Sequence, residues 1–318
     1  MKMRVIITTM CVALLLLLLA LSGCKPTPSG VDPDPPGQGD PSGQGGQATI
    51  HIPGVNAENY PKIDGSTANM PLLARLYAGI CGVTAEEAEA MVSVSGGTGA
   101  AWRSLLWGDV ELLIVYEAPD GIPEEFEDNG VRLEIDPVGR DGLVFLVNKA
   151  NPVSDLTVAQ LRDIYTGRTA DWQDVGGEPG PIVAFQRNAE SGSQTLFLKL
   201  LMDGEAPMDP PSELVPTSMG GLIEAVAGFD GSGGAIGYSV FYYADLMYAN
   251  PDLKLLSVDG IAPSFDSIAG SEYPFINDFF VVIREDAPED SPARLLRDWL
   301  LTDEGAALLR DAKYVPVR

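Results

Sequence analysis

Three short turns rich in glycine and hydroxyl residues are the segments of this sequence best suited to chemistry. They span residues 64–67 (DGST), 95–99 (SGGTG) and 187–195 (RNAESGSQT), and each lies between an expected strand and an expected helix. The first N–H groups of a helix have no intrahelical partner and lie at the positive end of its dipole, so a small anion there receives several hydrogen bonds. If the three turns meet in one cleft, they form an anion-binding site.

The third turn carries the strongest signal. It places Arg187, Glu190 and two serines around a glycine within residues 187–193. A guanidinium is permanently charged, and its planar donors match the oxygens of phosphate. Any one of these turns alone is more often a helix N-cap than a binding site. A plain cap, however, needs no arginine on its strand side.

The sequence has no motif typical of catalysis or of metal binding. His51 is the one histidine, and it lies beside a low-complexity segment, where a structural or exposed role is common. No CxxC, GxxxxGK[ST] or GxGxxG motif is present. The net charge of −25 opposes binding to nucleic acids or docking on anionic lipid. We therefore predict that the protein is not an enzyme and has no cofactor, metal or nucleic-acid partner.

The N-terminal residues resemble a bacterial lipoprotein signal. Lys2 and Arg4 precede an apolar run that ends in Leu-Ser-Gly-Cys24. This pattern predicts a signal peptide over residues 1–23 and a lipid anchor on Cys24, with an uncleaved signal-anchor helix as the alternative. Residues 24–48 are rich in Pro, Gly, Ser, Asp and Gln, which predicts a flexible tether.

Strands alternate with helices along the rest of the chain. Strands are expected at 48–52, 91–99, 110–116, 142–148, 181–187 and 273–286, and helices at 69–80, 84–91, 100–107, 156–167, 193–202 and 291–312. A capping box is expected at Thr84 and Glu87, and a helix start at Ser291 and Pro292. The alternation favours an α/β protein with a mainly parallel sheet covered on both faces.

Several longer segments resemble the phosphate-binding proteins of bacterial phosphate ABC transporters. They are residues 151–177, 182–197, 234–243, 273–286 and 291–317, beginning with NPVSDLTVAQLRDIYTG. The resemblance covers roughly residues 60–318 and implies a type II periplasmic binding protein fold, with two α/β lobes and phosphate held in the cleft between them. On this resemblance, lobe I comprises residues 49–140 and 250–318, and lobe II comprises residues 141–249.

The resemblance also implies the residues that contact phosphate. They are Ser66, Thr67, the amide of Ala68, Thr98, Glu117, Arg187, Ser191, Gly192 and Ser193. Glu117 stands where the family has an aspartate. A carboxylate only accepts hydrogen bonds, so it would favour phosphate, which carries a hydrogen at neutral pH, over sulfate, which carries none. Glu190 either pairs with Arg187 or is exposed.

The sequence thus predicts an extracytoplasmic, lipid-anchored monomer that binds inorganic phosphate and delivers it to ABC permease subunits. Three alternatives stay open. The ligand could be another oxyanion, such as sulfate, molybdate or tungstate; the protein could be a surface phosphatase; or it could use the fold as a sensor or adhesin. A permease pull-down would distinguish a transport protein from a sensor or adhesin.

Overall fold

The computed structural model describes residues 49–229 and 233–318. The predicted signal peptide, the lipidation site Cys24 and the tether lie outside the described residues. Within those two ranges, no helix combines the length and apolar character needed to cross a bilayer.

Eight of the described strands form one sheet, in the order β1-β2-β9-β3-β6-β5, with β10 and β7 also paired to β3. Its strands are β1 (Ile63–Gly65), β2 (Leu112–Val115), β3 (Leu133–Asn148), β5 (Val183–Ala184), β6 (Ala235–Val240), β7 (Leu253–Leu255), β9 (Ile276–Arg284) and β10 (Val315–Pro316). A separate two-stranded sheet pairs β4 (Asp155–Leu156) with β8 (Ser257–Val258).

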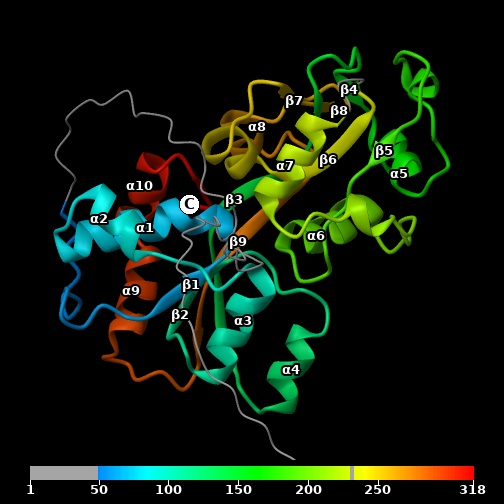
Figure 1. The fold of residues 1–318 in the computed structure, drawn as a ribbon. Coiled ribbons are helices and arrows are strands. Elements are labelled where there is room, and N and C mark those ends of the chain that lie inside the picture. Colours follow the sequence, from blue (N-terminus) through cyan, green and yellow to red (C-terminus); the bar gives the residue numbers. More distant parts are fainter. Residues whose placement is uncertain (1–48, 230–232) are drawn as a thin grey trace, which may run out of the picture.

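Strand β3 belongs to both halves of the molecule (Figure 1). Residues 133–142 pair with β9, whereas residues 143–147 pair with β6. We call the part built on β1, β2, β9 and the first half of β3 lobe I, and the part built on the second half of β3 with β5, β6 and β7 lobe II. The exact boundaries predicted for the lobes remain predictions.

The sheet of lobe I is covered on both faces. Its helices are α1 (Met70–Cys81), α2 (Ala85–Met91), α3 (Thr98–Trp107), α4 (Ile122–Asp128), α9 (Pro292–Leu300) and α10 (Asp303–Asp311). Along β2, Leu112 and Ile114 join the core formed with α1 and α9, while Leu113 and Val115 join the core formed with α3 and α4. Figure 1 shows the two sets of helices on opposite sides of the strands.

Lobe II is built around aromatic side chains. Its helices are α5 (Val158–Tyr165), α6 (Gly192–Leu196) and α7 (Met219–Gly228), and the π-helix η3 (Phe197–Met202) continues α6 directly. Phe197 stacks on Tyr238 with ring centroids 4.5 Å apart, and Tyr165 packs edge-on against both rings.

The short helices η2 (Trp172–Val175) and η4 (Ser212–Leu214) lie in the connecting loops. Between β6 and β9 the chain forms η5 (Tyr242–Met247) and α8 (Phe265–Ala269), which both contact β3.

Local helix signals were confirmed, whereas some strand predictions were wrong. Both the Thr84–Glu87 capping box and the Ser291–Pro292 helix start are present. A strand was expected at residues 48–52, but Ile52 makes only an isolated bridge. A second strand was expected at residues 91–99, but Met91 ends a helix, and the positive-φ glycines Gly96 and Gly97 follow it. The sheet is also not mainly parallel. Strand β3 pairs antiparallel with all of its partners, and β9, from the far end of the chain, lies antiparallel between β2 and β3.

Candidate anion-binding site

The first two hydroxyl turns meet in lobe I. The Ser66 and Thr98 hydroxyls lie 2.8 Å apart, and the main-chain N–H of Tyr116 donates to the Ser66 hydroxyl over 3.1 Å. Ser66 precedes the 3₁₀ turn η1 (Thr67–Asn69), which leads directly into α1, and Thr98 is the first residue of α3. Two helix starts and their hydroxyls therefore come together above the ends of β1 and β2.

The third turn reaches this group from lobe II. Gly192 lies so close to Thr98 that a Cβ atom added to the glycine would stand 2.5 Å from the Thr98 hydroxyl oxygen. On either side of it, the Ser191 and Ser193 hydroxyls are 3.0 Å apart. In Figure 1, α6 accordingly lies next to α3. The predicted residues Ser66, Thr98, Ser191, Gly192 and Ser193 are thus brought together across the two lobes.

Arg187 is held at the base of the third turn. Its main-chain N–H donates to Gln194 Oε1 over 3.0 Å and to the Tyr238 hydroxyl over 2.9 Å, and the Tyr238 hydroxyl also donates to Gln194. Its Nη2 donates to the carbonyl of Thr217 over 3.3 Å. Burial raises the pKa of Tyr238 above its ordinary value, so this phenol stays protonated and can donate. Arg187 is only 8% exposed, although arginine is seldom buried.

The remaining residues of the first turn are also buried. Thr67 opens η1, and Ala68 has no exposed surface. The carbonyl of Ala68 accepts a 2.7 Å hydrogen bond from the Tyr314 hydroxyl, which ties this turn to the C-terminal segment. Of the buried polar side chains in the three turns, those of Ser66, Thr67, Thr98, Ser191 and Ser193 carry hydroxyl donors, and Arg187 carries the positive charge. Hydroxyls, helix starts and one guanidinium form a set of donors suited to a small oxyanion.

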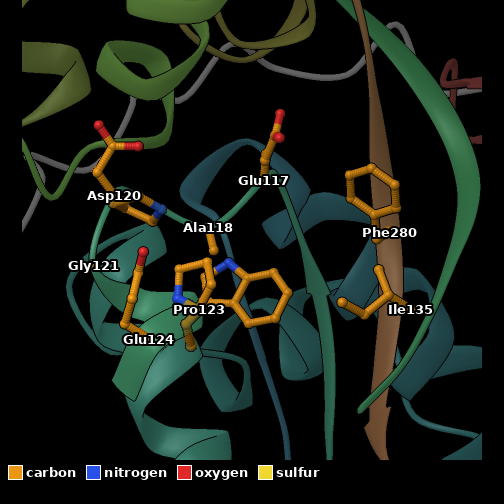
Figure 2. A pocket seen from close by; sticks show the side chains of 10 residues that line it. Glu117, Ala118, Asp120, Gly121, Pro123, Glu124, Ile135 and Phe280 are labelled. Carbon is orange, nitrogen blue, oxygen red and sulfur yellow. The ribbon is translucent and has the colours of Figure 1, made fainter. Parts of the chain in front are cut away.

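Glu117 is not brought into this group. Its Oε2 accepts a 2.6 Å hydrogen bond from Nζ of Lys199, a residue of η3 in lobe II, and both side chains are substantially exposed. Glu117 also lines a surface pocket of about 430 Å³ that has Trp102 and Phe280 among its walls. Figure 2 shows its carboxylate directed away from Phe280 and Ile135. The structure therefore gives Glu117 a basic partner in the other lobe instead of a place beside the hydroxyls.

Glu190 is exposed, the second of the two possibilities that the sequence left open, with 58% of its side-chain surface accessible. Its carboxylate binds Nη1 of Arg103 at 2.6 Å, and its carbonyl accepts from the N–H of Gly99 over 3.1 Å. Both partners belong to α3 of lobe I. Neither Arg103 nor Lys199 lies in a sequence motif, so these two contacts could not be predicted from the sequence.

Asp64 was recognised only as part of a turn, but it has a supporting role. This carboxylate is 2% exposed, and its Oδ1 accepts from the N–H of Gly65 at 2.7 Å and from that of Ser95 at 3.1 Å. It therefore joins the first turn to the second. His51 is exposed, in line with the role expected for it.

The fold and the sequence both match known binding proteins. The model of the PBP superfamily domain matches residues 54–304. The phosphate-binding protein PstS of Bacillus subtilis is 28% identical over 214 residues, which make up 67% of this chain and 66% of that protein. PstS of Staphylococcus aureus is 24% identical over 286 residues, or 86% of this chain and 81% of that protein.

Solved structures show the same architecture. A proposed phosphate ABC transporter substrate-binding protein from Clostridium perfringens, solved with bound phosphate, superposes with a TM-score of 0.61 at 24% identity and covers 82% of this chain and 100% of its own. An ABC-type phosphate transport receptor from Vibrio cholerae gives a TM-score of 0.59 at 24% identity, over 81% of this chain and 100% of its own. The predicted two-lobed type II fold is confirmed, and because the family model covers most of its length, the chain belongs to the PBP superfamily.

Proposed function

We propose that this protein binds inorganic phosphate between its lobes and delivers it to an ABC permease. The observation that carries the proposal is the meeting of buried hydroxyls from both lobes, Ser66 and Thr98 on one side and Ser191 and Ser193 on the other, beside the buried Arg187. A buried guanidinium and several hydroxyl donors can together stabilise a dehydrated anion, and an acidic exterior does not prevent this. The sequence relatives named for phosphate binding support the choice of ligand.

We also propose that the N-terminal segment anchors the protein at the membrane, close to its permease. A lipid on Cys24 and the tether to residue 48 would hold a monomeric binding protein on the outer side of the cell membrane, within reach of the permease. Membership of a family of binding proteins supports transport without catalysis. The proposed phosphate contacts are the residues predicted from the sequence other than Glu117, whose carboxylate binds Lys199, with Arg187 and the serine turn as the principal group.

Calorimetry tests the choice of ligand. The purified protein is unfolded, freed of carried-over ligand, refolded and titrated with phosphate, arsenate and sulfate. Arsenate matches phosphate in shape and carries a hydrogen as phosphate does, so both should bind. Sulfate has no hydrogen to donate to the hydroxyl oxygens of the site and should bind more weakly. Equal affinity for sulfate would favour a different oxyanion carrier. Turnover of a chromogenic phosphate ester that Arg187→Ala abolishes would instead indicate a phosphatase. Absence of heat with millimolar phosphate would refute the proposal.

A further inference from the structure

Glu190 links the two lobes through both its main chain and its side chain. Its carbonyl accepts from the Gly99 N–H, and its carboxylate binds Arg103; we call these two contacts the Glu190 bridge. Gly99 and Arg103 both lie on α3 of lobe I, whereas Glu190 belongs to the turn before α6 of lobe II. The bridge can therefore exist only when the lobes are together.

Arg103 is oriented within lobe I before it meets Glu190. Its Nε and Nη2 bind the carboxylate of Glu125 on α4, at 3.0 Å and 2.7 Å for the shortest contacts. This forked contact leaves Nη1 directed at Glu190. Because Glu125 already restrains the guanidinium, little further side-chain freedom is lost when lobe II arrives.

Gly99 provides the space that the bridge needs. A Cβ atom at this position would lie 2.1 Å from Glu190 Oε2 and 3.3 Å from the Glu190 carbonyl oxygen. The backbone of Gly99 does not have the positive φ that favours glycine, so alanine is compatible with its place near the start of α3. The absence of a side chain is therefore needed for contact with lobe II and not for the fold of lobe I.

We propose that Glu190 is a positioning residue that latches lobe II onto lobe I and slows release of the bound anion. Glu190 immediately precedes the turn Ser191–Gly192–Ser193, so the bridge sets how closely that turn approaches Thr98. A contact present only in the closed state shifts the population toward that state and lowers the dissociation rate. The role in ligand release rests on the proposed function, but the effect on lobe closure does not.

The test combines two ways of breaking the bridge with a matched control. Glu190→Gln removes the charge that binds Arg103, and Gly99→Ala displaces the Glu190 carboxylate by occupying its place. The control is Glu205→Gln, which removes an ion pair of similar exposure, Arg168–Glu205, that lies within lobe II. Far-ultraviolet circular dichroism and urea unfolding establish that each variant folds.

Two readouts separate the latch from the ligand assignment. In stopped-flow measurements at low ionic strength, phosphate should be released roughly three- to tenfold faster from Glu190→Gln and Gly99→Ala than from the wild type. This difference in release rate should shrink as salt is added. Glu205→Gln should release phosphate at the wild-type rate. Fluorescence energy transfer between dyes on the two lobes should show both bridge variants more open, with or without phosphate. Wild-type interlobe distances and release rates in both bridge variants would overturn the latch. Failure of the wild type to bind phosphate would instead refute the proposed ligand, and the ligand-free distances would still decide the latch.

Discussion

The Tyr116 hydroxyl donates a 2.7 Å hydrogen bond to Oδ2 of Asp141 at the point where β3 passes from lobe I to lobe II. Both side chains are buried. The same carboxylate accepts from the main-chain N–H groups of Gly142 and Tyr242 through Oδ1, at 2.7 Å and 3.1 Å. One carboxylate thus joins the end of β2, the crossing strand and the start of η5.

The burial of Asp141 should make stability depend on pH. Burial raises the pKa of Asp141 from 3.8 to about 6. Between those values the folded protein retains a proton that the unfolded chain has released, so the contribution of Asp141 to the free energy of unfolding should fall as pH rises from about 4 to about 6 and then level off. A pKa shift of this size corresponds to a change of about 3 kcal/mol in the free energy of unfolding. Urea unfolding at several pH values, for the wild type and Asp141→Asn, measures the effect. A constant difference between the two proteins across this range would contradict it.

Ser66→Ala should weaken both the fold and the site. The substitution leaves the buried N–H of Tyr116 without its 3.1 Å acceptor and removes the partner of Thr98. An unsatisfied buried donor costs about 1–3 kcal/mol, which urea unfolding can detect. Ser212→Ala, at an exposed position, is the control and should change neither stability nor phosphate affinity. Unchanged unfolding in Ser66→Ala would show that the N–H finds another partner.

Gly192→Ala should prevent close approach of the lobes while leaving each lobe folded. The added methyl would stand 2.5 Å from the Thr98 hydroxyl oxygen, which belongs to the other lobe. We expect phosphate affinity to fall roughly tenfold or more, because a misplaced methyl in a packed contact forces the lobes apart. The control is Gly180→Ala, where an added Cβ meets no atom within 4 Å. Calorimetry gives the affinities, and equal affinities for the two variants would contradict the prediction.

Glu117→Gln distinguishes the sequence hypothesis from the contact in the structure. If Glu117 accepts a hydrogen from phosphate, the substitution weakens phosphate binding selectively. The ion pair of Glu117 with Lys199 predicts instead that phosphate affinity falls only a few-fold. The ratio of phosphate to sulfate affinity should then stay unchanged. Lys199→Gln should give the same loss, and the double variant should add little to it. Calorimetry with both anions at one ionic strength decides between the two.

Features that depend on neighbouring residues could be predicted from the sequence alone. The Thr84–Glu87 capping box and the Ser291 helix start each involve contacts within a few residues, and the three hydroxyl turns are recognisable as short stretches of sequence. Such contacts are dictated by local hydrogen bonding and backbone preference. The α/β alternation and Arg187 beside its serine turn are local patterns of the same kind.

Partners that lie far apart in the chain were decided by the tertiary structure. Glu117 binds a lysine 82 residues away, and Glu190 binds an arginine 87 residues away. The position of β9 between β2 and β3, antiparallel to both, likewise joins segments that are far apart in the chain. Local patterns in the sequence are enough to predict which groups can bind an anion and where helices begin. Only the packing of the two lobes decided which charges face one another, because that choice depends on distances in space that no local pattern records.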